Sequence, residues 1–215
     1  MSLSKYKTLI FDCDGVVLNS NMVKTQAFFR AAAPYGNKAA QALVDYHIAN
    51  GGVSRYKKFE YFLQNLVTPD SLGPTLQDLL TRFAAEVHQG LLTCEVANSL
   101  QTLRENTPGI RWLIVSGGDQ NELRDIFSER GISSFFDGGI YGSPDTKEVI
   151  LHRELERSNI LTPAILFGDS RYDHIAAKSI AIDFLFVHNW SEFSDYEQYC
   201  KNNALTTIAS LSDLL

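Results

Sequence analysis

Acidic side chains follow two short apolar runs of this chain. Asp12 and Asp14 end the first run, and Asp169 ends another, with Asp173 four residues further on. Apolar runs of this kind are typical of strands that are buried on both faces of a parallel sheet. Ligands of such sheets bind beyond the carboxyl ends of the strands. We therefore expect the four carboxylates to lie close together at one edge of a sheet.

A hydroxyl and an ammonium have similar positions in the sequence. Ser116 ends a third apolar run and precedes Gly117, while Lys147 stands at the start of an expected helix. Two like unit charges about 4 Å apart repel by about 4 kcal/mol at an effective dielectric constant near 20, so clustered carboxylates need a cation. Mg²⁺ takes carboxylate oxygens together with substrate phosphate. The residue types therefore predict a Mg²⁺ site for phosphoryl transfer, in which an Asp attacks phosphorus.

The elements that position these residues are short strands alternating with amphipathic helices. Strands are expected at residues 8–11, 112–115, 165–167 and 184–187, and helices at 119–130 and 146–158. This alternation is typical of a doubly wound α/β domain with a parallel, Rossmann-like sheet.

Residues 18–95 have a different pattern, with helix-like stretches and no convincing buried strand. Ser54 is expected to cap a helix that runs through Phe59, Phe62 and Leu66. We interpret this region as an all-helical cap domain, inserted into a discontinuous core domain of residues 1–17 and 96–215.

The sequence resembles the haloacid dehalogenase-like (HAD) hydrolase superfamily, because four motifs occur in the order of that family. They are Ile10 to Val17 (IFDCDGVV), Ser116 after Val115, Lys147 in the stretch that begins Gly142-Ser143-Pro144, and Gly168 to Asp173 (GDSRYD). One such motif is weak evidence, whereas all four together are specific. The resemblance covers nearly all of the expected core domain.

The resemblance implies a role for each matched residue. Asp12 would be the nucleophile that becomes an aspartyl-phosphate, and Asp14 the general acid and base. Ser116, Gly117 and Lys147 would bind the phosphoryl group, and Lys147 would also orient Asp12. Mg²⁺ would be held by the carboxylates of Asp12 and Asp169 and the main-chain carbonyl of Asp14, with Asp173 acting through metal-bound waters.

The helical insertion resembles the cap of the phosphoglycolate phosphatase and β-phosphoglucomutase branch. The stretch from Gly52 to Arg55 (GVSR) resembles a loop that offers an Arg to the substrate, so Arg55 is a candidate specificity residue. Two positions depart from the branch, because Asn19-Ser20 replaces Asp-Ser and Ile180-Ala181 replaces Ala-Gly. Because of these two departures, the resemblance to one particular subfamily is weaker than the resemblance to the superfamily.

Other polar residues have simpler interpretations. Lys57 and Lys58 are expected on the solvated surface of the cap, His174 is expected to pack rather than to bind metal, and Cys13 is expected to be an inert buried thiol. We therefore expect the catalytic residues to come from the four motifs.

Composition argues against two other classes of protein, nucleic-acid-binding proteins and membrane-spanning proteins. The net charge of −6 lacks the basic character of a nucleic-acid-binding protein, and no apolar run is long enough to span a membrane. Three cysteines without metal-ligand spacing favour a reducing cytoplasm. The oligomeric state is open.

Three functions remain open at this point. The first is a Mg²⁺-dependent phosphatase acting on a small phosphorylated metabolite. The second is a phosphomutase of the β-phosphoglucomutase kind, which would share every core residue. The third is a non-catalytic phosphate-binding regulatory module, against which Asp14 argues, since a binding protein needs no acid or base there.

Overall fold

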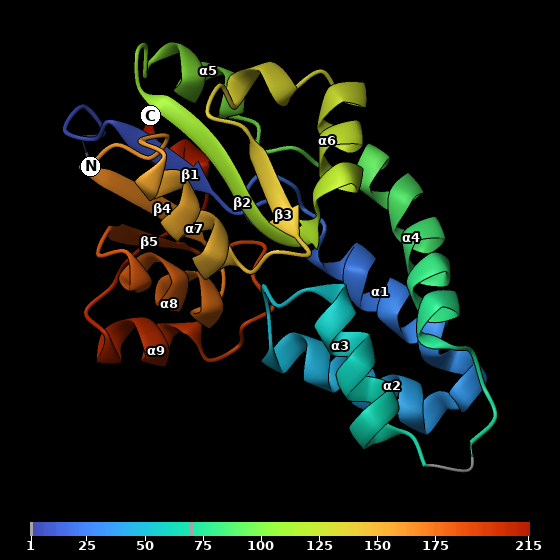
Figure 1. The fold of residues 1–215 in the computed structure, drawn as a ribbon. Helices are drawn as coiled ribbons and strands as arrows, with labels where there is room; N and C mark the ends of the chain where they lie inside the picture. The colour runs from blue at the N-terminus through green and yellow to red at the C-terminus, as the bar shows by residue number, and fades with distance from the viewer. Residues whose placement is uncertain (1, 69–70) are drawn as a thin grey trace.

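The computed structural model describes residues 2–68 and 71–215. Its centre is a six-stranded parallel sheet with the strand order β3-β2-β1-β4-β5-β6 (Figure 1). The strands are β1 (Thr8–Phe11), β2 (Arg111–Asp119), β3 (Ile140–Ser143), β4 (Ala164–Gly168), β5 (Asp183–Val187) and β6 (Thr206–Ile208). The predicted fold class is confirmed, and the four predicted strands are β1, β2, β4 and β5. Strands β3 and β6 were not predicted.

Both faces of the sheet are buried, which explains the continuous apolar runs. Leu9 and Phe11 of β1 belong to one apolar cluster, which also contains Leu123 and Phe127, whereas Ile10 belongs to a second cluster on the other face. The covering helices are α5 (Leu100–Glu105), α6 (Gln120–Glu129), α7 (Lys147–Glu156), α8 (Arg171–Ser179) and α9 (Tyr196–Asn202). Helices α6 and α7 confirm the two helices predicted between the strands.

The described part of residues 18–95 is helical, as predicted. It contains α1 (Asn21–Ala32), α2 (Asn37–Ala49), α3 (Arg55–Tyr61) and α4 (Leu76–Thr93), which are gathered beside the sheet in Figure 1. The ring of Phe28 on α1 lies 5.2 Å from that of Phe59 and 4.3 Å from that of Phe83, measured between centroids. Ser54 caps α3, which continues through a π-helical turn at Phe62–Leu66. These helices therefore share an aromatic core.

Two adjacent connections join the helical segment to the rest of the chain. The N–H of Ala97 donates to the carbonyl of Val17 at 2.9 Å, and the N–H of Asn19 donates to the carbonyl of Glu95 at 2.9 Å. The chain thus leaves and re-enters the sheet region through one short antiparallel pair. This pair lies at the predicted boundaries, and the division into core and cap domains remains a prediction.

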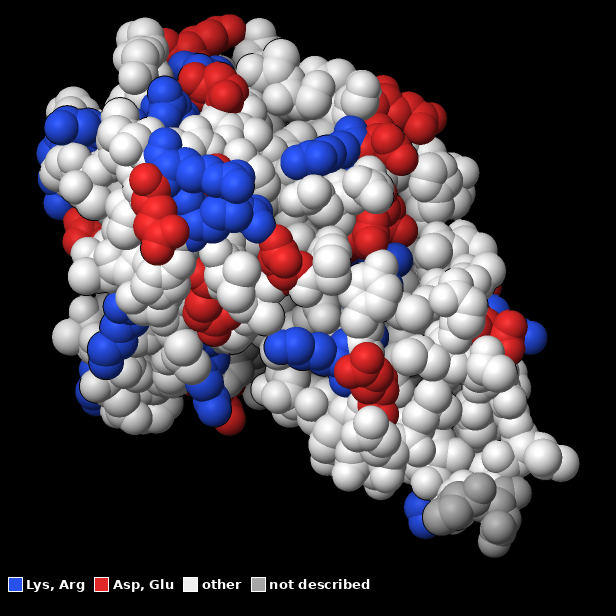
Figure 2. All heavy atoms as spheres, in the orientation of Figure 1, with Lys and Arg blue, Asp and Glu red and all other residues white. Residues whose placement is uncertain are grey.

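Surface charge is mixed on the face seen in Figure 2, where acidic and basic side chains alternate over the sheet region. Among the residues that the structure describes, every helix is too short or too polar to cross a lipid bilayer.

Candidate active site

Asp12 and Lys147 form a buried ion pair at the carboxyl edge of the sheet. Asp12 directly follows β1, Lys147 is the first residue of α7, and Asp12 Oδ2 lies 2.8 Å from Lys147 Nζ. The N–H of Cys13 donates to Asp12 Oδ1 at 2.7 Å. Burial raises the pKa of Asp12 to about 7, with a further increase from Asp173 that the Lys147 ammonium partly offsets. Asp12 is therefore a desolvated carboxylate that a cation would stabilise.

The structure brings Asp12, Asp169 and Asp173 together. Each offers a carboxylate oxygen, and these oxygens lie within 4.8 Å of one another at buried positions. Burial and the charges of Asp12 and Asp173 raise the pKa of Asp169 well above its usual range. The Lys147 ammonium pairs with Asp12 and Asp173, which leaves negative charge in the cluster that a divalent cation would balance. The all-oxygen donor set fits Mg²⁺.

Asp173 is less available than Asp12 and Asp169 as a direct metal ligand, because both of its carboxylate oxygens already have hydrogen-bond or ion-pair partners. Oδ1 pairs closely with Lys147, and Oδ2 accepts hydrogen bonds from the Ser170 hydroxyl at 2.6 Å and the Ser170 N–H at 3.1 Å. These bonds also cap α8. Asp173 therefore holds Lys147 in place and contributes charge to the cluster.

Asp169 is oriented by the first residue of α1. Asn21 Nδ2 donates to Asp169 Oδ2 at 2.7 Å and to the carbonyl of Trp190 at 2.8 Å. Asn21 was not among the predicted site residues, because its contact with Asp169 joins positions 148 residues apart.

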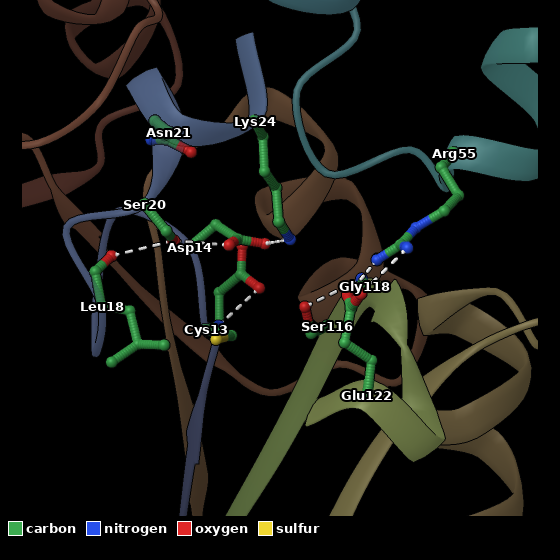
Figure 3. A network of polar contacts seen from close by, with 12 residues as sticks. Cys13, Asp14, Leu18, Ser20, Asn21, Lys24, Arg55, Ser116, Gly118 and Glu122 are labelled. Carbon is green, nitrogen blue, oxygen red and sulfur yellow. Dashed lines mark hydrogen bonds and ion pairs between the residues drawn. The ribbon is translucent and has the colours of Figure 1, made fainter. Parts of the chain in front are cut away.

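Asp14 lies outside the acidic cluster and is held by the start of the helical segment (Figure 3). Its carboxylate accepts a hydrogen bond from the Ser20 hydroxyl at 2.6 Å and pairs closely with Lys24 on α1. Burial favours the protonated form, but Lys24 and Ser20 outweigh it and lower the pKa of Asp14. Asp14 is thus held as a carboxylate, the form that can activate water. The metal contact of its main-chain carbonyl remains a prediction.

Ser116 and Gly117 lie within β2, which extends beyond the predicted strand. Ser116 is fully buried, and its hydroxyl accepts a hydrogen bond from the Gly118 N–H at 3.0 Å (Figure 3). A Cβ atom on Gly117 would lie 2.1 Å from the carbonyl oxygen of Gly52. Glycine at position 117 therefore lets the loop before α3 lie against the end of the sheet. Phosphate binding by Ser116 and Gly117 remains a prediction.

Arg55 reaches from the helical segment to a carboxylate of the core, as Figure 3 shows. Its guanidinium pairs closely with Glu122 on α6, with Nη1 at 3.2 Å from Oε1, and lies over the ring of Phe83. Next to it, the Tyr56 hydroxyl donates to Asp119 at 2.7 Å. Arg55 lines the cavity, but its charge is already balanced by Glu122, and its role in specificity remains a prediction.

A cavity of about 230 Å³ lies between the acidic cluster and the helical segment. Its lining includes Asp12, Asp14 and Asp169 from the core side and Lys24, Arg55, His47 and Lys58 from the helices. Lys57 is exposed as expected, but Lys58 is only 2 % exposed, so the prediction that it is solvated is wrong. Both Lys24 and Lys58 were missed as residues of the site.

His174 packs against Phe184 and Cys13 is buried, as expected for both side chains. His174 Nδ1 lies 2.8 Å from the Tyr199 hydroxyl, outside the acidic cluster. Cys13 is fully buried, and burial holds the pKa of its thiol well above the usual range, which disfavours reactivity.

The fold is a parallel α/β sheet with an acidic cluster at its carboxyl edge. The model of the haloacid dehalogenase-like hydrolase family matches residues 9–187, and the chain belongs to this family. A phosphorylated carbohydrates phosphatase of Thermotoga maritima is 24% identical over 207 residues, covering 86% of this chain and 88% of that protein.

Solved structures share the fold. A candidate phosphoglycolate phosphatase from Lactobacillus plantarum superimposes with a TM-score of 0.73 at 19% identity, covering 98% of both chains. A haloacid dehalogenase-like family hydrolase from Streptococcus pneumoniae gives 0.68 at 19% identity, covering 99% of this chain and 98% of the other. CbbY from Rhodobacter sphaeroides, solved with phosphate, gives 0.66 at 15% identity and covers 85% and 86%.

Proposed function

We propose that this hydrolase is a Mg²⁺-dependent phosphatase that acts on a small phosphorylated metabolite through an aspartyl-phosphate on Asp12. The observation that carries the proposal is the buried Asp12–Lys147 pair, 2.8 Å apart, within a cluster of three carboxylates that fits a divalent cation. This arrangement supplies a nucleophile and the positive charge that phosphoryl transfer requires.

The reaction proceeds in two steps. Asp12 attacks phosphorus, the ester P–O bond breaks, and the leaving oxygen takes a proton from Asp14. Asp14, now a carboxylate, takes a proton from a water molecule that attacks phosphorus, which releases phosphate and restores Asp12. The Lys24 ammonium favours the carboxylate needed in the second step. In the first step a phosphate group beside Asp14 opposes Lys24 and favours the protonated acid.

The other residues bind and position the phosphoryl group. Lys147 orients Asp12 and neutralises a phosphoryl oxygen, while Ser116 and Gly117 offer hydrogen-bond donors at the end of β2. Asp12 and Asp169 would hold Mg²⁺ when it is bound, with Asp173 contributing charge, and the ion would supply additional positive charge for the phosphoryl oxygens. Residues around the cavity surround the substrate and limit the access of water during the first step.

The nature of the substrate is supported by the cavity and by a relative. A cavity of about 230 Å³ suits a small metabolite, and the Thermotoga maritima relative is named for phosphorylated carbohydrates.

The three cysteines are free thiols in the structure, which supports a place of action in the reducing cytoplasm.

Hydrolysis of para-nitrophenyl phosphate tests the proposal. We expect Mg²⁺-dependent release of phosphate and a loss of at least about 10³-fold in kcat for Asp12→Asn, because the nucleophile is removed. Asp125→Asn, an exposed substitution on α6, is the matched control and should keep full activity. Substantial turnover by Asp12→Asn would overturn the assignment of the nucleophile, and full activity in excess chelator would overturn the metal requirement.

A phosphomutase remains the alternative, because it would use the same core residues. The sequence argument for it was the loop with Arg55, whose charge Glu122 balances in this structure. Isomerisation of a sugar phosphate after priming by a bisphosphate, without net release of phosphate, would favour the mutase.

A further inference from the structure

Lys58 is a buried amine whose hydrogen-bond partner is an uncharged imidazole. It lies on α3, 2 % exposed, and its Nζ is 2.7 Å from His47 Nδ1 on α2. Burial and the ammonium groups of Lys58 and Lys24 lower the pKa of His47 well below its usual range, so the imidazole is neutral. Lys58 therefore lies in a desolvated place without charge compensation from its partner, and burial, together with Lys24, lowers the pKa of Lys58 to about 7.

Three other basic side chains of the site each have a carboxylate partner. Lys24 pairs with Asp14, Arg55 with Glu122, and Lys147 with Asp12 and Asp173. Within residues 2–68 and 71–215, no carboxylate lies at ion-pair distance from Lys58 Nζ. An unpaired buried charge is strongly unfavourable, whereas an anion beside it would stabilise it.

The tautomer of His47 adds a second donor. When Lys58 is protonated it can only donate, so in that state Nδ1 of His47 accepts from Lys58 and the ring proton stands on Nε2. His47 is 7 % exposed, and its Nε2 is buried without a hydrogen-bond partner in the described structure. Glu192 Oε2 lies 3.9 Å away, beyond hydrogen-bond distance, and both Glu192 oxygens accept from Thr25 at 2.9 Å. Lys58 and His47 thus offer N–H groups that lack an acceptor.

Packing fixes these two donors in place. The ring of Phe28 lies 4.5 Å from that of His47 between centroids, and Lys58 Nζ is 5.5 Å from the centroid of Phe28. Both residues line the cavity that also contains Asp12 and Asp14. A molecule whose phosphate meets Asp12 could therefore meet Lys58 and His47 with its other end.

We propose that Lys58 and His47 form a subsite for a second anionic group, a carboxylate or a phosphate, on the phosphate ester that this enzyme hydrolyses. The inference rests on the proposed phosphatase function and adds the class of substrate. The second anion accepts hydrogen bonds from Lys58 Nζ and His47 Nε2 and neutralises the charge that the protein leaves unpaired. A neutral hydroxyl at the same place leaves that charge uncompensated, so acidic substrates are preferred.

Matched ester pairs test the subsite. The carboxylate arm compares 3-phosphoglycerate with glycerol 3-phosphate, and the phosphate arm compares 1,3-propanediol bisphosphate with its monophosphate. We expect kcat/KM to favour the acidic member of at least one pair by about tenfold or more, and Lys58→Met to remove that preference. The pair that shows the preference identifies the second anion. Because the readout is a ratio measured on one sample, partial misfolding of a variant does not change it.

Two further variants separate charge from packing. Lys58→Arg should keep much of the preference, and Lys38→Met, an exposed change on α2, should keep all of it. Equal kcat/KM within both pairs, or a preference that survives in Lys58→Met, would overturn the subsite while leaving the phosphatase function intact. Failure of the phosphatase function would give a different result, because no ester would then be hydrolysed in an Asp12-dependent way.

Discussion

Two lysines show how a helix can carry a cation on its apolar side. Lys24 shares the buried side of α1 with Ala27 and Phe28, and Lys58 lies beside the buried Phe59 on α3. Both residues line the cavity, and the aliphatic stem of a lysine can pack on apolar surface while its amine reaches a polar place. Their positions on an apolar helix face are the signal that sequence reasoning could have used.

The lowered pKa of Lys58 should make the free energy of unfolding depend on pH. Burial and Lys24 lower its pKa to about 7 in the folded protein, against an ordinary value of 10.5. The groups that act on it are His47, Lys24, Asp14, Glu192 and Lys147. Between these two pKa values the unfolded chain holds a proton that the folded protein does not, so the free energy of unfolding rises with pH.

Urea unfolding of Lys58→Met at pH 7 and at about pH 9.5 measures this effect. Met removes the buried charge, so the variant should gain stability relative to the wild type at pH 7, and this gain should shrink by at least about 1 kcal/mol at the higher pH. Lys38→Met should give the same small difference at both pH values. A Lys58→Met difference that does not change with pH would contradict this account.

At the scale of elements, the ion pair between α3 and α6 fastens the helical segment to the core. Both side chains of the Arg55–Glu122 pair are largely buried, at 6 % and 12 % exposure. A double-mutant cycle with Arg55→Ala and Glu122→Ala should give a coupling of about 1–3 kcal/mol in the free energy of unfolding. The matched control is Arg30–Glu86 between α1 and α4, at 61 % and 38 % exposure, whose coupling should be below about 1 kcal/mol. Equal couplings would rule out a special role for the buried pair.

The elements were predictable where their sequence pattern is strong. The runs at β1, β2, β4 and β5 are apolar because the sheet is covered on both faces. Strand β3 contains Gly142 and lies at one edge, and β6 has three residues with mainly exposed side chains, so neither has a buried apolar run. The extension of β2 through Gly117 and Gly118 also lacks β propensity and depends on its tertiary contacts.

The site was predictable where it follows strand ends. Asp12 and Asp169 follow recognisable strands and Ser116 ends the apolar run of β2, and parallel topology brings the carboxyl ends of strands to one edge. The pairing of Arg55 with Glu122 joins residues 67 positions apart on two helices, and no local pattern contains it. The same holds for Lys58 and His47, which meet only through the packing of α3 on α2.

At the scale of the whole molecule, the acidic cluster should couple Mg²⁺ to stability. Without metal, the mutual repulsion of Asp12, Asp169 and Asp173 destabilises the folded protein, so Asp169→Asn should raise the melting temperature. Saturating Mg²⁺ should raise the melting temperature of the wild type by about 5 °C or more, and that of Asp169→Asn by much less. Asp125→Asn should behave as the wild type in differential scanning fluorimetry. An equal Mg²⁺ response of wild type and Asp169→Asn would place the metal elsewhere.

The central claim is that Asp12 carries the phosphoryl group during turnover. The direct measurement mixes enzyme with a hydrolysed ester in the presence of Mg²⁺, quenches the reaction in acid within the first turnover, and identifies the modified peptide by mass spectrometry. The account predicts a phosphoryl group on Asp12 that hydroxylamine removes and that Asp12→Asn lacks. Burst release of the alcohol without any phosphorylated peptide, or a phosphoryl group on another residue, would contradict it.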